Sequence, residues 1–234
     1  MNTASNEVHI HFARLDRGSA ETARLERFLV PGERTRADRL LSRLLRDRFI
    51  AGRGFLRETL SGYLGVKPED IFLAENEWGK PRLVETAGPK ALFFNLSHAA
   101  DLAVMAVSRI SELGIDLERV EEGLPIRAMA RIFFSPREQM DLLSLPAEEQ
   151  PSAFFRCWTR KEAYLKGCGS GFTHSPRSFD VSLLPGHPPA LHAHQAFPED
   201  PAVWSLIDIP VPRGYWATLA FTGESPDIKL WGSG

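Results

Sequence analysis

Apolar and polar residues alternate with a period of two near the start of the chain, and apolar residues then follow a helical period. The alternation in residues 7–15 places His9 and His11 on the polar side of a predicted strand, and we interpret both as part of a solvated face because no third metal ligand lies nearby. A helical pattern runs from about residue 21 to residue 49, and a further helix is expected to end at Gly65.

The middle of the chain carries a strand pattern followed by a second helical region. Residues 91–98 and 101–108 are short apolar runs joined by a polar connection, which predicts a hairpin, and "GIDLE" at 114–118 follows as a third strand. Residues 126–134 have a helical period, and Ser135 begins the next predicted helix with a proline and a glutamate placed as in a capping box.

The last third of the chain repeats this order of helices and strands. The helical run at 151–167 ends among the glycines 167, 169 and 171, and three strand-like runs separated by proline and glycine follow it. Strand, helices and hairpin are thus echoed by strand, helices and strands. The pattern predicts an α+β protein of two α+β subdomains, residues 1–112 and 113–234.

Composition narrows the class of protein. The chain has 234 residues, 43% of them hydrophobic and 25% charged, with a formal charge of −2, which is typical of a globular protein and argues against disorder or a generally basic nucleic-acid-binding chain. The start of the chain lacks the features of a signal peptide, and no apolar run is long enough to span a membrane. Cys157 and Cys168 lack zinc-site spacing. We therefore expect a cytoplasmic protein with free thiols.

The two acids of "GIDLE" are unusual in an apolar strand. Side chains alternate across a strand, so Asp116 and Glu118 share one face while Ile115 and Leu117 share the other. The Cα atoms of the two acids are then roughly 7 Å apart, close enough for both carboxylates to reach one ion. Alternation alone favours a strand that has one solvated face.

A third acid is available on the predicted helix at 151–167. Glu162 and Lys166 are four residues apart beside its largely apolar face, where they either form a plain surface ion pair or contribute to a site. Three carboxylates converging on one point repel one another unless a cation joins them, and oxygen ligands suit Mg²⁺ together with the phosphates of a substrate. The residue types therefore favour a magnesium site that handles pyrophosphates.

Several basic and polar residues are candidates for holding phosphates, namely Lys80, Ser97 and His98. An arginine-rich region adds Arg34, Arg36, Arg39, Arg43, Arg46, Arg48, Arg53 and Arg57. Most of these arginines are expected to be solvated charges, and a subset could bind a polyanion. The residues alone leave open a magnesium-dependent phosphoesterase that hydrolyses a nucleotide, and a protein that binds nucleic acid.

Five motifs in order resemble a known family. "GKPRL", "FNLSHAADLAVMAVS", "GIDLE", "FFSPREQ" and "FFRCWTRKEAYLKGCGSGF" span about residues 79–172 and are similar to the Sfp-type phosphopantetheinyl transferases. The "WTRKEA" wording resembles the tryptophan-KEA branch, which is linked to carrier proteins of polyketide, nonribosomal peptide and fatty-acid synthesis. The resemblance implies a pseudo-twofold monomer that binds coenzyme A between its halves and moves the phosphopantetheine arm onto a serine of an apo acyl or peptidyl carrier protein, releasing adenosine 3',5'-bisphosphate.

The resemblance also implies roles for individual residues. Asp116, Glu118 and Glu162 are expected to hold Mg²⁺ on the pyrophosphate, with Asp116 counted among the catalytic residues. Lys166 is expected to contact the phosphates and assist the leaving group, and Glu162, directly or through water, to act as the base for the carrier serine. The remaining expected contacts to coenzyme A are Lys80, Ser97, His98 and, for the 3'-phosphate, Arg53.

Overall fold

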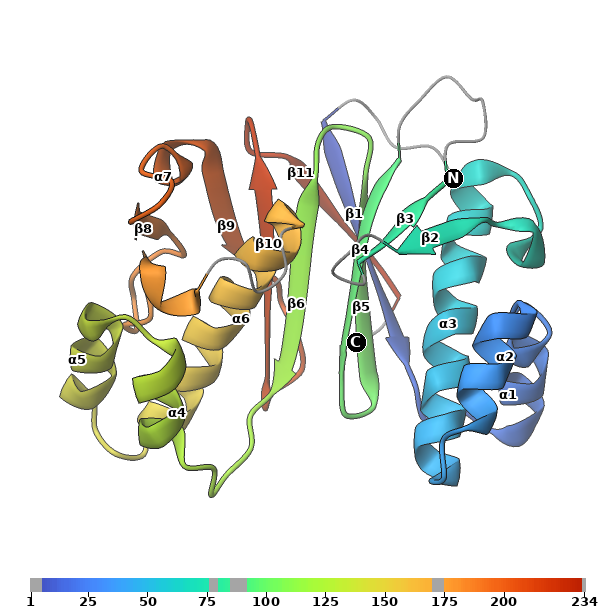
Figure 1. Cartoon of the computed structure of the whole chain (residues 1–234), viewed down its shortest axis with the longest axis horizontal. Helices are drawn as coiled ribbons and strands as arrows, with labels where there is room; N and C mark the ends of the chain where they lie inside the picture. The colour runs from blue at the N-terminus through green and yellow to red at the C-terminus, as the bar shows by residue number, and fades with distance from the viewer. Residues whose placement is uncertain (1–5, 76–79, 85–91, 170–174, 233–234) are drawn as a thin grey trace.

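The computed structural model describes residues 6–75, 80–84, 92–169 and 175–232. Gly79, Gly171 and Phe172, which belong to the motifs above, lie outside these residues. Two β-sheets stand side by side in the middle of the molecule, and helices flank them on both sides, α1 to α3 on one and α4 to α6 on the other (Figure 1). The predicted α+β fold class is confirmed.

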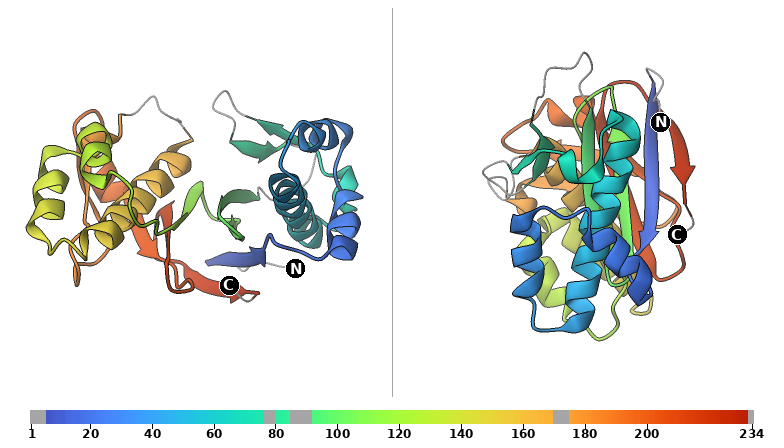
Figure 2. Two further views of the ribbon diagram at one scale, coloured as in Figure 1. Left: turned by 90° about the horizontal axis from the view of Figure 1, so that it is seen from below. Right: turned by 90° about the vertical axis from the view of Figure 1, so that its right-hand side faces the viewer.

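The first sheet has the strand order β11-β1-β5-β4. Its strands are β1 (Glu7–Arg14), β4 (Phe93–Ala99), β5 (Leu102–Ser108) and β11 (Asp227–Trp231). The hairpin of β4 and β5 is antiparallel, as predicted, and β1 pairs antiparallel with β5. Strand β11 comes from the far end of the chain and pairs parallel with β1, so the last strand belongs to the sheet of the first half (Figure 2).

Three helices cover this sheet, where the sequence pattern predicted two. They are α1 (Ser19–Glu26), α2 (Pro31–Asp38) and α3 (Arg43–Leu64). The expected boundaries were wrong because α2 begins with a proline, which fits a first helical turn, and the Ser42 side chain accepts the N–H of the third residue of α3. Helix α3 then continues through the expected break and ends at Gly65 with φ 70°, as predicted.

The prediction for His9 and His11 was also wrong, because both side chains are buried. His9 Nδ1 and His11 Nε2 each lie 2.6 Å from the hydroxyl oxygen of Tyr63, on α3, and the ring of Trp231, on β11, stacks on His11. Burial, with a smaller effect of His9, lowers the pKa of His11 to about 4. Helix α3 and strand β11 cover the face that alternation alone assigns to solvent.

The second sheet has the order β6-β10-β9, with β6 (Leu113–Arg119), β9 (Trp204–Asp208) and β10 (Tyr215–Thr222). Helix α6 (Gln150–Cys168) packs along it and ends at Gly169 with φ 65°. The strands predicted for "GIDLE" and for the three later runs are confirmed, as β6, the short β7 (Phe179–Val181), β9 and β10.

Shorter elements complete both halves. They are the turn η1 (Pro68–Asp70), the hairpin β2 (Leu73–Glu75) and β3 (Pro81–Leu83), helices α4 (Ile126–Phe133), α5 (Pro136–Ser144) and α7 (Asp200–Val203), the turn η3 (Pro176–Ser178), and the hairpin β7 (Phe179–Val181) and β8 (Leu191–His194). Ser135 and Glu138 form the capping box of α5, as predicted. Among the described helices, none is both long and apolar enough to cross a membrane.

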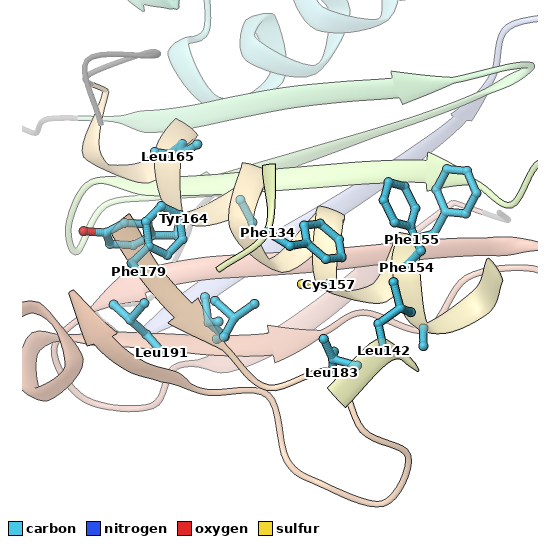
Figure 3. Close-up of a cluster of buried hydrophobic side chains, with 14 of the residues drawn as sticks. Phe134, Leu142, Phe154, Phe155, Cys157, Tyr164, Leu165, Phe179, Leu183 and Leu191 are labelled. Atoms are coloured by element: carbon cyan, nitrogen blue, oxygen red, sulfur yellow. The ribbon is translucent and has the colours of Figure 1, made fainter. Parts of the chain in front are cut away.

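An aromatic core holds α6 in place. Phe134 stacks on Phe154, and Tyr164 packs edge-on against Phe179, so the residues that follow α4, the helix α6 and strand β7 share one cluster (Figure 3). Because burying a large apolar side chain contributes about 1.5–3 kcal/mol, this cluster fixes the helix firmly against the second sheet.

Candidate active site

A pocket of about 350 Å³ opens between β4, β6 and α6. Its lining consists of Leu96, Ser97, His98, Asp116, Leu117, Glu118, Trp158, Glu162 and Lys166. The polar members come from both sheets and from the helix, so the pocket lies at the meeting of the two halves of the molecule.

Strand β6 brings the first two acids to the pocket. Ile115 and Leu117 are fully buried in a core cluster, while Asp116 and Glu118 leave the strand on the other face, as the period of two predicts. That face is not a solvated one, because Asp116 is itself buried and Glu118 is half-buried. The strand therefore carries its acids into a partly enclosed space.

Helix α6 lies directly on β6, and glycine makes this approach possible. A Cβ atom at Gly114 would overlap the carbonyl oxygen of Ala163 and the backbone nitrogen of Gly167. Only glycine lets the two backbones touch in this way. The contact brings Glu162 and Lys166 over the acids of the strand.

Asp116 stands at the centre of the polar contacts. Its Oδ1 accepts hydrogen bonds from Lys166 Nζ at 2.5 Å and from Ser97 Oγ at 3.0 Å. Its Oδ2 is buried and has no hydrogen-bond partner among the described residues. Lys166 thus pairs with a carboxylate of the strand, 50 residues away, instead of forming a simple surface pair with Glu162. The second oxygen of Asp116 is left able to bind a further group.

The pKa values of the other two carboxylates are raised by their surroundings in the pocket. Burial and the charge of Asp116 raise the pKa of Glu118 to about 7, although Lys166 and the indole N–H of Trp158 oppose the shift. The same two causes, burial first and then Asp116, raise the pKa of Glu162, and Lys166 again opposes them. Within the described residues, no three acidic, histidine or cysteine side chains already surround one point as a finished metal site.

Comparison with known proteins places the chain in a family. The model of the 4'-phosphopantetheinyl transferase superfamily matches residues 112–220, and the model of the N-terminal part of 4'-phosphopantetheinyl transferases matches residues 18–110. The 4'-phosphopantetheinyl transferase HetI of Nostoc sp. is 37% identical over 97% of this chain and 92% of its own length. The chain belongs to the 4'-phosphopantetheinyl transferases. Its activity is the transfer of phosphopantetheine to carrier proteins.

Further relatives are also named 4'-phosphopantetheinyl transferases. The transferase psf-1 of Bacillus pumilus is 34% identical over 68% of this chain and 66% of its own length, and Sfp of Bacillus subtilis is 30% identical over 70% of each. The crystal structure of the holo-[acyl-carrier-protein] synthase of Thermotoga maritima matches with a TM-score of 0.33 and 22% identity, over 47% of this chain and 61% of that one.

The structure of the transferase gathers six of the eight site residues predicted from the sequence. Asp116, Glu118, Glu162, Lys166, Ser97 and His98 all line the pocket. The other two lie outside the lining. Lys80 donates to Glu112 and to the carbonyl oxygen of Leu113, at the start of β6, while Arg53 of α3 pairs with Glu33 at 2.6 Å. Glu33 also pairs with the buried Arg57.

Two residues of the transferase site were missed by the sequence analysis. Trp158 lines the pocket, and its Nε1–H donates to Glu118 Oε1 at 3.1 Å. Its position four residues before Glu162 was a usable signal, because such residues are neighbours on a helix. Asn95 accepts the N–H of Ile115 through Oδ1 at 2.8 Å. The signal there was a single amide inside the apolar run of β4.

Proposed function

We propose that this transferase takes its phosphopantetheine group from coenzyme A and works with Mg²⁺ held by Asp116, Glu118 and Glu162. The observation that carries the proposal is the buried Oδ2 of Asp116, which has no partner among the described residues and belongs to a pocket shared with two further carboxylates. An unpaired buried carboxylate oxygen is costly, and a divalent cation would satisfy it.

The donor set fits magnesium. All three candidate ligands are carboxylates, which Mg²⁺ prefers, and the raised pKa values of Glu118 and Glu162 reflect burial and mutual repulsion that a cation would relieve. Both glutamates line the same pocket as Asp116. When bound, Mg²⁺ would neutralise charge on the pyrophosphate oxygens.

The remaining chemistry belongs to the side chains of the chain itself. In the proposed reaction the serine Oγ of the carrier bonds to the phosphorus of the phosphopantetheine group, and the bond from that phosphorus to the bridging oxygen breaks to release adenosine 3',5'-bisphosphate. Glu162, directly or through water, accepts the serine proton, a role that a carboxylate lining the pocket can take as a general base. Lys166 stabilises the phosphates and the departing oxygen.

The contacts to coenzyme A are proposed with different degrees of structural support. His98 is exposed at the pocket, where it can meet a phosphate. The Ser97 hydroxyl donates to Asp116 and accepts from Leu117 N–H and from Lys166, so it orders these groups in addition to any contact with the substrate. Lys80 and Arg53 would have to exchange their present acidic partners for phosphates.

The proposal also covers the working form of the protein. We propose a monomer of two subdomains, 1–112 and 113–234, whose boundary agrees with the two matched family segments. Strand β11 then reaches across from the second subdomain to the sheet of the first. Cys157 and Cys168 are free thiols, which suits the proposed cytoplasmic location.

Intact-mass analysis of an apo carrier protein tests this function. We expect incubation with the transferase, coenzyme A and Mg²⁺ to add one phosphopantetheine group, and chelation of the metal by EDTA to stop the reaction until Mg²⁺ is restored. Asp116→Ala and Glu162→Ala are each expected to lower the rate by about 10²-fold or more while the protein stays folded by circular dichroism.

Three outcomes would count against the proposal. No adduct on fatty-acid, polyketide and peptide carriers would contradict coenzyme A as the donor, and transfer that persists after EDTA would contradict the metal. Release of adenosine 3',5'-bisphosphate without an adduct would instead support a nucleotide phosphoesterase.

A further inference from the structure

The two sheets meet where β4 lies beside β6, and no ladder of backbone hydrogen bonds joins these two strands. We call this junction the seam. Strand β4 is the edge of the first sheet and β6 is the edge of the second. Side chains of β4 reach across to the backbone of β6: Asn95 Oδ1 accepts the N–H of Ile115 at 2.8 Å, and Ser97 Oγ accepts the N–H of Leu117 at 3.2 Å. Two side chains thus replace the carbonyl groups that a neighbouring strand would supply.

These two hydrogen bonds satisfy groups that solvent cannot reach. Ile115 and Leu117 are buried, and an edge strand exposes every second N–H on its unpaired side. A buried N–H without an acceptor is strongly unfavourable, so the seam depends on the acceptors that β4 provides. Asn95 is itself buried and holds its oxygen toward β6.

The seam also determines where the catalytic acid lies. Asp116 sits between the two anchored residues, and the same strand continues to Glu118. On the other side of the seam, Ser97 and His98 follow Asn95 along β4 and line the same pocket. The position of β6 relative to β4 therefore sets the distance between the acids of β6 and the pocket residues of β4.

We propose that Asn95 is a positioning residue of the transferase. By holding Ile115 N–H it keeps the acid-bearing strand of the second half in place against the first half, so that Asp116 and Glu118 face the groups of β4. The inference rests on the proposed function of the pocket. It differs from that proposal because Asn95 contacts neither substrate nor metal, and acts through the backbone of β6.

Two variants at Asn95 distinguish the loss of the hydrogen-bond acceptor from a change in the size of the side chain. Asn95→Leu keeps the volume and removes the acceptor, whereas Asn95→Asp keeps an oxygen at the same place. Ser182→Ala is the matched control, because Ser182 Oγ accepts the N–H of Ala190 in the second half, away from the pocket. Ser182 Oγ also accepts from the Arg160 guanidinium, which keeps its hydrogen bonds to Asp208 and to the Ser182 carbonyl oxygen, so the control loses a side-chain acceptor of a backbone N–H without touching the seam.

Hydrogen–deuterium exchange and Mn²⁺ binding give readouts that do not need a carrier protein. We expect Asn95→Leu to speed amide exchange in residues 113–119 by about tenfold or more, since an unpaired buried N–H costs on that scale. Titration followed by electron paramagnetic resonance should show Mn²⁺ bound about tenfold more weakly, as for other groups that orient metal ligands. Asn95→Asp should recover much of both, and Ser182→Ala should match the wild type in both.

Transfer assays complete the test. Asn95→Leu is expected to lower kcat with little change in KM for coenzyme A, because the residue does not contact the substrate. Unchanged exchange in residues 113–119, or losses of Mn²⁺ affinity and kcat no larger than in Ser182→Ala, would overturn the inference. A wild-type protein that exchanges and binds Mn²⁺ as expected but modifies no carrier would refute the proposed function and leave the role of Asn95 in the seam standing.

Discussion

Helix α6 carries two lysines that each pair with a carboxylate, and the two pairs differ in how completely their hydrogen bonds are used. Lys161 lies 2.8 Å from Glu138, and both side chains are 1% exposed. Lys166 lies 2.5 Å from Asp116, with 30% of the lysine and 3% of the aspartate exposed. The residue types are nearly the same and the helix is the same.

The Lys161–Glu138 pair is closed, in the sense that the ammonium N–H groups and both carboxylate oxygens have partners within the protein. Its ammonium group contacts Glu138 and donates to the carbonyl oxygens of Pro176 and Phe179, which uses all three N–H groups. The carboxylate of Glu138 also accepts from the backbone N–H groups of Ser135 and Val181. Every charge is therefore met inside the protein, and the pair ties α5, α6 and β7 together.

The Lys166–Asp116 pair is open, in the sense that part of its hydrogen-bonding capacity is unused among the described residues. One oxygen of Asp116 is used twice and the other has no partner among the described residues, while Lys166 reaches the pocket. A polar cluster with unused capacity is poor as a structural anchor and well suited to receiving a ligand. The difference teaches that hydrogen-bond saturation, more than residue type, separates the structural pair from the pair that we propose to be catalytic.

The largest expected effect is on stability, from breaking the closed pair. Lys161→Met leaves the carboxylate of Glu138 buried without its cation, and we expect a loss of about 3–5 kcal/mol in the free energy of unfolding, measured by urea denaturation. Adding Glu138→Leu should recover part of the loss, because an apolar pair avoids the uncompensated charge. A single variant as stable as the wild type would show that the pair is not the anchor described.

Breaking the open pair should act on catalysis instead. Lys166→Met is expected to lower the rate of carrier modification by about 10²-fold or more, with a smaller loss of stability than Lys161→Met, because the ammonium of Lys166 is partly exposed and is proposed to stabilise charge in the transition state. Lys166→Arg keeps the charge and should retain more activity. If Lys166→Met loses as much stability as Lys161→Met and keeps its rate, the distinction between the two pairs fails.

A third polar cluster extends the comparison, and breaking it has the smallest expected effect on stability. Tyr63 contacts His9 and His11 through one hydroxyl, and both histidines lie on β1, which β5 separates from the pocket strand β4. Tyr63→Phe removes those two hydrogen bonds, and we expect a loss of about 1–3 kcal/mol in the free energy of unfolding and no change in kcat. Thermal melting and the transfer assay measure the two quantities, and a lower kcat would mean that this closed cluster also serves the site.

The local pattern was sufficient for the parts of the fold that depend on near neighbours. The period of two placed Asp116 and Glu118 on one face of β6, and Ser135, Gly65 and Gly169 marked helix ends that the structure confirms. These features are settled within a few residues of chain, where side-chain direction and backbone preference act directly. The ordered motifs added the family, and with it the expected roles of Asp116, Glu118 and Glu162.

Contacts between distant segments could not be obtained in this way. The sequence determined strands β1, β4 to β7, β9 and β10, several of the helix ends and the set of acids, whereas only the tertiary structure decided what each polar group meets. It paired Lys166 with Asp116, buried His9 and His11 under α3 and β11, and placed Asn95 opposite Ile115. Periodicity tells which face of an element a residue occupies. The element that covers this face comes from elsewhere in the chain, and its position determines whether a charged group is solvated, fully hydrogen-bonded or left able to bind a ligand.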